Sequence, residues 1–356
     1  MKKHNFSAGP AILPADAFIQ AAEAVQDLNG MGLSILEISH RSPEFVEILD
    51  EAVALPKELL HIPDTHEVLY LTGGASSQFF MTAMNLLPHN GKAAYLDTGS
   101  WSTKAIKEAR LFGEVEVLAS SKDKNYTYIP KQYSAPTDAA YLHYTSNNTI
   151  FGTQYQQLPQ AEVPLVCDMS SDIFSRPVDV SRFAVIYAGA QKNLGPAGTT
   201  LVIVNKDLLG KVEREIPTML DYRTHIKKNS AFNTPPVFPI YVSMLTLRWI
   251  KANGGVAEMA KRNEAKAQLV YDAIDRNPLF TGTAAKEDRS RMNATFVADD
   301  PGVEKAFLQA CQDANIAGMK GHRSVGGFRA SIYNAMPTAS IEVLVDLMDD
   351  FAQKHG

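Results

Sequence analysis

Short apolar runs alternate with amphipathic stretches from Glu67 onward, which is the pattern of βα units that build a mainly parallel sheet. Seven of the apolar runs have the length of strands, and they cover residues 68–72, 93–97, 115–119, 139–143, 165–168, 184–188 and 200–204. The stretches between the first three runs have the periodicity of helices. The link between the last two is too short for a crossover helix, so this pair should be antiparallel. The pattern predicts an α/β fold with a seven-stranded, mainly parallel sheet and one reversed strand.

Helical periodicity also predicts elements on both sides of this region. The first is a helix over residues 14–28, whose buried face should carry Phe18, Ile19, Ala22 and Val25. The remaining elements are helices over 45–60, 240–249, 256–274 and 303–314, strands over 293–297 and 329–333, and a final amphipathic helix. We therefore expect a large domain over residues 15–260 and a smaller C-terminal α/β domain over 261–356, with residues 1–14 packing near the smaller one.

Composition excludes several classes of partner. The 356 residues carry a formal net charge of -5, which gives no general electrostatic reason to bind nucleic acid or an anionic membrane. Cys167 and Cys311 are too few for a disulfide framework and fit a reducing cytoplasm. The N-terminus lacks the apolar region of a signal peptide, and no apolar run is long enough to span a bilayer. We expect a cytoplasmic protein.

Lys192 follows a buried apolar run, at the turn where small residues break the strand over residues 184–188. Glycine and alanine neighbours leave such a lysine little cover, so it is well placed to face a cleft. Burial lowers the proton affinity of an amine, which suits Schiff-base chemistry. A surface lysine in a hairpin is the alternative interpretation of this segment taken alone.

Two other predicted strands end in residues that suit a ring bearing a phosphate. Gly73 and Gly74 lead directly into a helix with Ser76 and Ser77, and the free N–H groups of a helix start form an anion site. Trp101 follows the second strand, where its indole could stack on a flat group. A helix N-cap without a ligand and a tryptophan in the core are the corresponding structural alternatives.

Asp168 ends the fifth predicted strand, and residues 145–149 give a polar cluster after the fourth. A buried carboxylate needs a cation or several donors, and a protonated pyridine nitrogen would be such a partner. The anion site, the indole, the aspartate and Lys192 follow one another along the chain. Together they fit pyridoxal 5'-phosphate better than any other ligand.

Two His-Arg-Ser triplets indicate an anionic substrate. His40 and Arg41 lie in an irregular early segment, and His322 and Arg323 lie in a glycine-rich loop that leads to Arg329. Arginine matches the geometry of carboxylate and phosphate, whereas solvated basic loops are the alternative. Two such clusters imply a substrate with more than one anionic group. We expect no metal site.

The chain resembles the phosphoserine aminotransferases, a family of class V, fold type I pyridoxal-phosphate enzymes, over nearly its whole length. The motifs that carry the resemblance are Asn5–Pro10, His40–Ser42, Gly73–Ser76, Trp101, Asp168, 189–193, 233–235 and 321–327. The last motif is the most specific, because other class V aminotransferases lack its paired His-Arg. Some members have an arginine where this chain has Ser76, so the backbone amides should bind the phosphate here.

The resemblance implies a role for each matching residue. Lys192 would hold the cofactor in an imine linkage, Asp168 would pair with the pyridine nitrogen, Trp101 would stack on the ring, and Thr149 would contact its hydroxyl side. The residues implied for the cofactor phosphate are Ala75, Ser76 and Gln191, with Asn233 and Thr234 of the second subunit of a homodimer. The residues implied for the substrate are Ser7, His40, Arg41, His322, Arg323 and Arg329, the last on the α-carboxylate.

The implied reaction is a ping-pong transamination from L-glutamate to 3-phosphohydroxypyruvate, in serine biosynthesis. A related phosphorylated substrate in pyridoxine biosynthesis is left open. The alternatives are another class V aminotransferase, such as one that acts on serine and glyoxylate, and a phosphometabolite-binding protein without catalysis.

Overall fold

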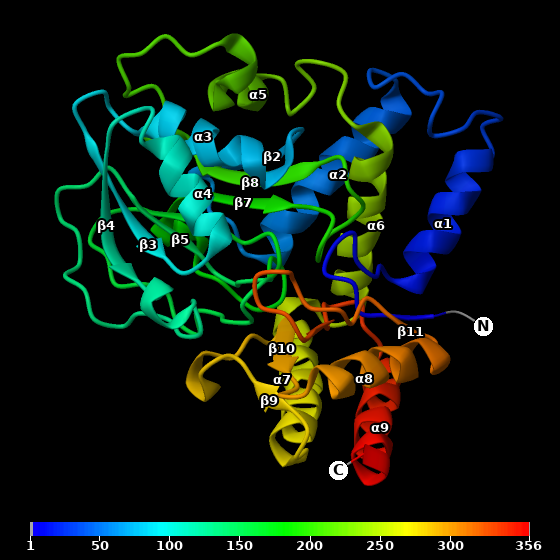
Figure 1. Cartoon of the computed structure of the whole chain (residues 1–356). Helices are drawn as coiled ribbons and strands as arrows, with labels where there is room; N and C mark the ends of the chain where they lie inside the picture. The colour runs from blue at the N-terminus through cyan, green and yellow to red at the C-terminus, as the bar shows by residue number, and fades with distance from the viewer. Residues whose placement is uncertain (1–2, 356) are drawn as a thin grey trace.

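The computed structural model describes residues 3–355, and a seven-stranded sheet forms its centre (Figure 1). The strands follow the spatial order β2 (His66–Leu71), β8 (Thr200–Asn205), β7 (Phe183–Gly189), β6 (Leu165–Asp168), β5 (Leu142–Thr145), β3 (Lys92–Asp97) and β4 (Glu114–Ser120). Strand β8 is antiparallel to both neighbours, and the other pairs are parallel. The prediction of seven strands with one reversed is confirmed, although β5 begins at Leu142 rather than at residue 139.

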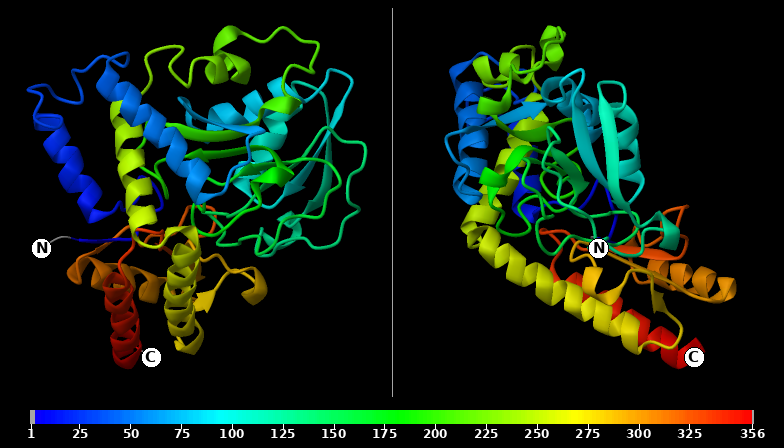
Figure 2. Two further views of the ribbon diagram at one scale, coloured as in Figure 1. Left: turned by 180° about the vertical axis from the view of Figure 1, so that it is seen from behind. Right: turned by 90° about the vertical axis from the view of Figure 1, so that its left-hand side faces the viewer.

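Both faces of this sheet are buried except along the edge strand β4, as is usual when most strands are parallel. In β2, Val68 and Tyr70 join one buried apolar cluster, whereas Leu69 and Leu71 join another, following the two-residue repeat of a strand. The helices over the first cluster are α1 (Ala15–Gln26), α2 (Pro43–Leu59) and α6 (Val237–Ala252). Those over the second are α3 (Gly74–Leu86), α4 (Ser100–Ala109) and the short α5 (Tyr222–Lys227) (Figures 1 and 2).

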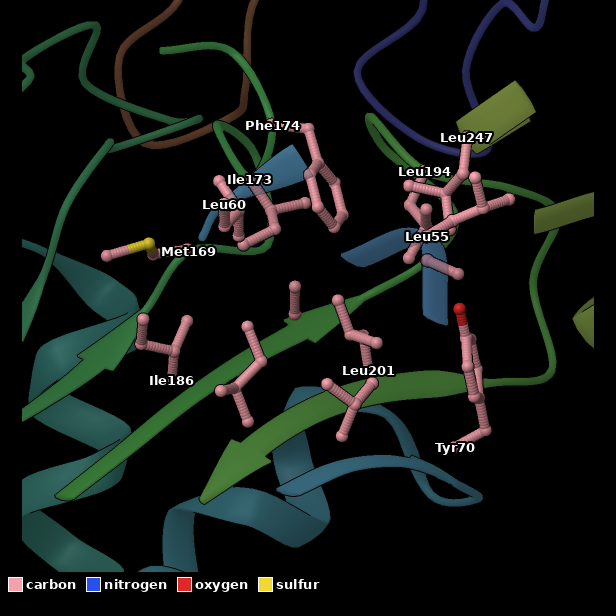
Figure 3. Close-up of a cluster of buried hydrophobic side chains, with 14 of the residues drawn as sticks. Leu55, Leu60, Tyr70, Met169, Ile173, Phe174, Ile186, Leu194, Leu201 and Leu247 are labelled. Carbon is pink, nitrogen blue, oxygen red and sulfur yellow. The ribbon is translucent and has the colours of Figure 1, made fainter. Parts of the chain in front are cut away.

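The first cluster fixes the helices on the sheet. Leu55 of α2 and Leu247 of α6 lie close to Tyr70 and Leu201 of the sheet (Figure 3). The Tyr70 hydroxyl crosses this layer and donates a hydrogen bond to the carbonyl of Ala52 at 2.8 Å. A buried phenol is thereby satisfied within an apolar layer.

The buried face of α1 differs from the prediction, which is wrong. The buried residues of this helix are Ala17, Ala21 and Ala24. Phe18, Ile19 and Val25 are 48%, 57% and 37% exposed, and Ala22 is also exposed. Small alanine side chains let α1 approach α6 closely, because the distance between packed helices depends on the side chains between them. The large apolar side chains consequently face outward.

The C-terminal part of the chain builds a second group of elements below the large sheet in Figure 1. Its antiparallel sheet has the order β12 (Phe328–Ser331), β10 (Asn293–Val297) and β9 (Thr281–Gly282), and its helices are α7 (Gly255–Arg276), α8 (Pro301–Asp313) and α9 (Thr338–His355). The N-terminal strand β1 (His4–Asn5) pairs in parallel with β11 (Ile316–Ala317), and Phe6 enters the core of this group.

Helix α7 belongs to both groups, because Met259 packs in the core under the large sheet and Val270 packs in the C-terminal core. The division into domains at residue 260 stays a prediction. No helix within residues 3–355 has both the length and the apolar character needed to cross a bilayer.

Candidate active site

The carboxyl ends of β5, β6 and β7 bring polar residues to one edge of the large sheet. Thr145 of β5 pairs in register with Asp168 of β6, which in turn pairs with Tyr187 of β7. Beyond these strands the chain continues into Thr149 on one side and Lys192 on the other. Ligands of open α/β sheets bind at this edge, so these segments form the candidate site.

Lys192 lies at the centre of this edge. Its Nζ donates a hydrogen bond to Thr149 Oγ1 at 2.7 Å and lies 5.2 Å from the centroid of the Trp101 ring. Burial lowers the pKa of Lys192 to about 8, Asp168 opposes this shift, and the positive charge of Arg329 adds to it. A substantial fraction of the amine is therefore neutral near physiological pH, as a nucleophile or base requires.

Asp168 lies beside the lysine and is 4% exposed. Burial raises the pKa of its carboxyl group, while the charge of Lys192 and hydrogen bonds from Ser170 act against that rise. Ser170 donates to Oδ1 twice, from its backbone N–H at 2.9 Å and from its hydroxyl at 2.6 Å. Within residues 3–355 no other hydrogen bond reaches this carboxylate, so Oδ2 is available to a ligand.

The predicted anion site is the N-terminus of α3, which begins at Gly74. Gly73 precedes it with a φ of 92°, and a Cβ on Gly73 would lie 1.9 Å from Ser77 Oγ. Only glycine fits this position without strain. Ala75 is half-buried and Ser76 is exposed, and their N–H groups belong to the first helical turn, where backbone donors lack helical partners.

Trp101 stands in the first turn of α4 and is half-buried. It packs against a small apolar cluster that contains Ile150 and Phe151, and Val325 of the glycine-rich loop packs against the same cluster. The amine of Lys104 lies 4.7 Å from the Trp101 ring centroid. The C-terminal loop and the indole therefore pack against the same apolar cluster.

This loop brings several cations together. The pKa of His322 is lowered by burial and then by the charges of Arg329, Arg323 and Lys104. Gly321 allows the loop to close, because a Cβ there would lie 1.9 Å from the carbonyl oxygen of Gly326. Charges of one sign that lower the pKa of a histidine form a region suited to an anion.

Arg329 extends from β12 toward the same threonine as Lys192. Its Nη1 donates to the Thr149 carbonyl at 3.1 Å. Its Nε is buried and has no hydrogen-bond partner within residues 3–355. An unpaired buried guanidinium donor is costly, and an anionic ligand would satisfy it.

The N-terminal segment crosses the turn that bears Lys192. The N–H of Ala11 donates to the carbonyl of Gln191 at 2.9 Å, and Gln191 is half-buried. A Cβ on Gly9 would lie 3.3 Å from Lys192 Cγ. Ser7, also half-buried, lies directly against Gly318, so the segment runs from the C-terminal group to the lysine turn.

Four predicted site residues do not bond to Lys192 or Arg329 within the described chain. Arg41, Asn233 and Thr234 are exposed, and His40 is half-buried with Nε2 unpaired within the described chain. Over residues 3–355, none of the hydrogen bonds or ring contacts of Lys192 and Arg329 involves these four. Asn233 lines a cavity of about 140 Å³ whose other lining residues include Gly73 and Ser77 at the start of α3. Their roles at the site stay predictions.

Ser170 is a residue of the site that had no predicted role. Its position two residues after Asp168 was a usable signal, because the side chain of an aspartate commonly accepts the backbone N–H two residues later. The hydroxyl bond to the same oxygen had no such signal, since it depends on the path of the chain after β6.

Comparisons with known proteins agree with this geometry. A family model described as "Aminotransferase class-V" matches residues 3–344. The chain is 60% identical to the phosphoserine aminotransferase of Flavobacterium johnsoniae, covering 99% of this chain and 100% of that one, and 59% identical to that of Parabacteroides distasonis, covering 100% of both.

Solved structures of phosphoserine aminotransferases are also similar to this chain. The phosphoserine aminotransferase from Bacillus circulans subsp. alkalophilus superimposes with a TM-score of 0.96 at 46% identity, covering 100% of this chain and 99% of that one. The pyridoxal-phosphate-bound enzyme from Trichomonas vaginalis has a TM-score of 0.94 at 38% identity, covering 98% and 100%. An alanine–glyoxylate aminotransferase from Nostoc sp., at 15% identity, shares the fold.

Proposed function

Because the chain belongs to the class V aminotransferase family, we propose that it transfers the amino group of L-glutamate to 3-phosphohydroxypyruvate. The products are O-phospho-L-serine and 2-oxoglutarate, and the reaction serves serine biosynthesis. The chain is a transferase that depends on pyridoxal 5'-phosphate. The observation that carries the proposal is a half-buried lysine of lowered pKa held between Thr149, Trp101 and Asp168.

The residues at the sheet edge fit this cofactor. Oδ2 of Asp168 can accept a proton donor such as a ring nitrogen, and the Trp101 ring presents a flat surface beside Lys192 Nζ. The N-terminus of α3 offers backbone donors to a phosphate. We infer that Lys192 attaches the cofactor and that Thr149, Ala75, Ser76 and Gln191 complete its site. The bound cofactor draws electrons from the substrate α-carbon.

Lys192 acts in the reaction as a base and then as an acid. Once a substrate amine replaces it, its Nζ would be free to remove the proton from the substrate α-carbon and to donate it to the cofactor carbon on the other side of the shared nitrogen. Burial keeps the amine partly neutral for this step. Burial raises the pKa of Asp168, whereas Lys192 and then Ser170 favour its ionised form, which suits a protonated partner at Oδ2. The ping-pong order follows, since one lysine serves both half-reactions.

The cations around the lysine select the substrate. Arg329 has a buried, unpaired Nε suited to the α-carboxylate common to both amino acids. His322 and Arg323 bind the second anionic group of the substrate, which is a phosphate in one substrate and a side-chain carboxylate in the other. The proposal assigns His40 and Arg41 to the same anion and Ser7 to the substrate side of the site.

We further propose a homodimer with shared active sites. Apolar side chains are exposed on α1 and on the loop after it, and the large ones are Ile19, Val25, Met31, Leu33 and Leu36. A soluble monomer rarely exposes so many neighbouring apolar groups, and a second copy would cover them. Asn233 and Thr234, both exposed, would then contribute to the cofactor phosphate site of the partner.

Two further assignments complete the proposal. The large domain covers residues 15–260 and the small domain covers 261–356, with residues 1–14 beside it, and the separate C-terminal core supports this division. The cytoplasm is the proposed location. Cys167 and Cys311 are both buried free thiols, which fits a reducing compartment.

A coupled assay tests the reaction. Purified protein with O-phosphoserine and 2-oxoglutarate should form glutamate, and serine or alanine with glyoxylate should react far more slowly. Lys192→Ala should abolish turnover and the visible absorbance of the cofactor, whereas Lys206→Ala, a surface control, should change neither. Equal rates with phosphorylated and unphosphorylated substrates would contradict the assigned specificity, and a colourless wild-type protein would contradict the cofactor.

A further inference from the structure

Ser170 joins Asp168 to the strand that leads to Lys192. Its backbone N–H and its hydroxyl both donate to Asp168 Oδ1, at 2.9 Å and 2.6 Å. The same hydroxyl accepts the N–H of Gly189 at 3.1 Å, and Gly189 is the last residue of β7. Ser170 is 4% exposed. One small side chain therefore links the carboxylate to the strand end from which the lysine turn departs.

These bonds decide which oxygen of Asp168 is left for a ligand. Across residues 3–355 the hydrogen bonds to this carboxylate end on Oδ1, so Oδ2 is the oxygen that can pair with an incoming donor. Donors on Oδ1 also favour the ionised carboxylate against the effect of burial. Only an ionised Asp168 can stabilise a protonated ring nitrogen.

We propose that Ser170 is a positioning residue, which fixes the Asp168 carboxylate for the ring nitrogen of pyridoxal 5'-phosphate and couples it through Gly189 to the turn that carries Lys192. The proposal rests on the proposed function, because it takes this cofactor as the ligand of Asp168. Ser170 touches neither the substrate nor the reacting atoms, so its effect passes through Asp168.

Ser171 offers a matched control beside it. Ser171 is 2% exposed, its hydroxyl donates to the Asn147 carbonyl at 3.0 Å, and it accepts Asn147 Nδ2 at 2.8 Å. Removing either hydroxyl leaves one buried donor without its acceptor. Only the hydroxyl of Ser170 bonds to Asp168, so a difference between the two variants reports on that bond.

The test compares wild-type, Ser170→Ala and Ser171→Ala holoenzymes by cofactor dissociation and by pH titration of the visible absorbance. Ser170→Ala should weaken cofactor binding about tenfold, the usual effect of losing a hydrogen bond to a charged group. The proton on the nitrogen that joins Lys192 to the cofactor should titrate at higher pH, because a ring nitrogen that is less protonated repels it less. Ser171→Ala should leave this titration unchanged.

The outcomes distinguish a failure of the proposed function from a failure of the role proposed for Ser170. A wild-type protein that binds no pyridoxal phosphate overturns the proposed function, whereas wild-type binding with identical titrations in both alanine variants overturns only the role of Ser170. Should Ser170→Ala fail to fold, Ser170→Thr and Ser170→Val form a second pair of equal shape. The threonine variant should keep the wild-type titration and the valine variant should shift it, and equal titrations would again overturn the role.

Discussion

Lys192 and Arg329 meet at a single threonine. The amine donates to the Thr149 hydroxyl at 2.7 Å, and the guanidinium donates to the Thr149 carbonyl at 3.1 Å. Lys192 comes from the edge of the large sheet, and Arg329 comes from the C-terminal sheet. The two cations are thereby held near each other, and Arg329 contributes to the lowered pKa of Lys192.

Replacing Arg329 should raise the pKa of Lys192. Arg329→Gln removes a positive charge that disfavours the protonated amine, so the pKa should move up from about 8. The pH dependence of Lys192 modification by an amine-specific reagent, in cofactor-free protein, measures the shift. Arg323→Gln is the control, because Arg323 is exposed and is not among the charges that act on Lys192. An equal shift in both variants would point to a general charge effect instead.

Removing the amine of Lys192 should stabilise the cofactor-free protein near neutral pH. Its pKa falls from 10.5 in the unfolded chain to about 8, so the unfolded chain binds more protons in this window and stability declines as pH falls through it. Lys192→Met should therefore raise the free energy of unfolding at pH 7 by on the order of 2 kcal/mol.

Urea unfolding at several pH values checks this expectation. The gain from Lys192→Met should shrink as pH rises from about 8 toward 10.5, because folding then removes a proton from the amine, and the free energy needed to remove that proton falls as pH approaches 10.5. A gain that stays constant over this range would show that packing, and not the buried charge, is responsible.

Changing Gly73 should damage the phosphate end of the site. Gly73→Ala forces a Cβ to within 1.9 Å of Ser77 Oγ at a φ of 92°, so the start of α3 must shift. We expect cofactor affinity to fall about tenfold, the equivalent of 1–2 kcal/mol of strain. Gly30→Ala is the control, since Gly30 has a φ of 74° but open space around its Cβ position. Equal losses of affinity in the two variants would show that the close approach to Ser77 is not the cause.

A charge on the exposed face of α1 should separate the proposed dimer. Ile19 is 57% exposed, so Ile19→Asp should leave the fold intact while halving the mass measured by light scattering. Leu111→Asp is the control, because Leu111 is 73% exposed at the end of α4, away from α1. If the Ile19 variant keeps the wild-type mass, another surface must join the subunits.

The large sheet could be predicted because all its strands except β4 are buried on both faces and form apolar runs that sequence alone reveals. The orientation of α1 could not. Phe18 and Ile19 dominate any apolar stripe, whereas the contact with α6 uses alanines. An apolar face that another chain covers has the same pattern as one that faces the core, so periodicity does not distinguish them.

The site was predictable along the sheet edge and not beyond it. Asp168 and Lys192 follow strands whose order fixes their proximity. The contact of Arg329 with Thr149 depends on how the C-terminal group packs on the sheet, which no local pattern encodes. His40 and Arg41 show the same limit, since the residues that they would meet depend on the assembly.

The pairing of β1 with β11 has a consequence for synthesis of the chain. Phe6 is synthesised long before Phe296 and Phe328, with which it shares the C-terminal core. The large sheet is complete by Asn205, so it can form while translation continues. The N-terminal strand must wait unpaired until Ala317 has emerged. The segment that crosses the Lys192 turn therefore cannot take its final place before β11 has been synthesised.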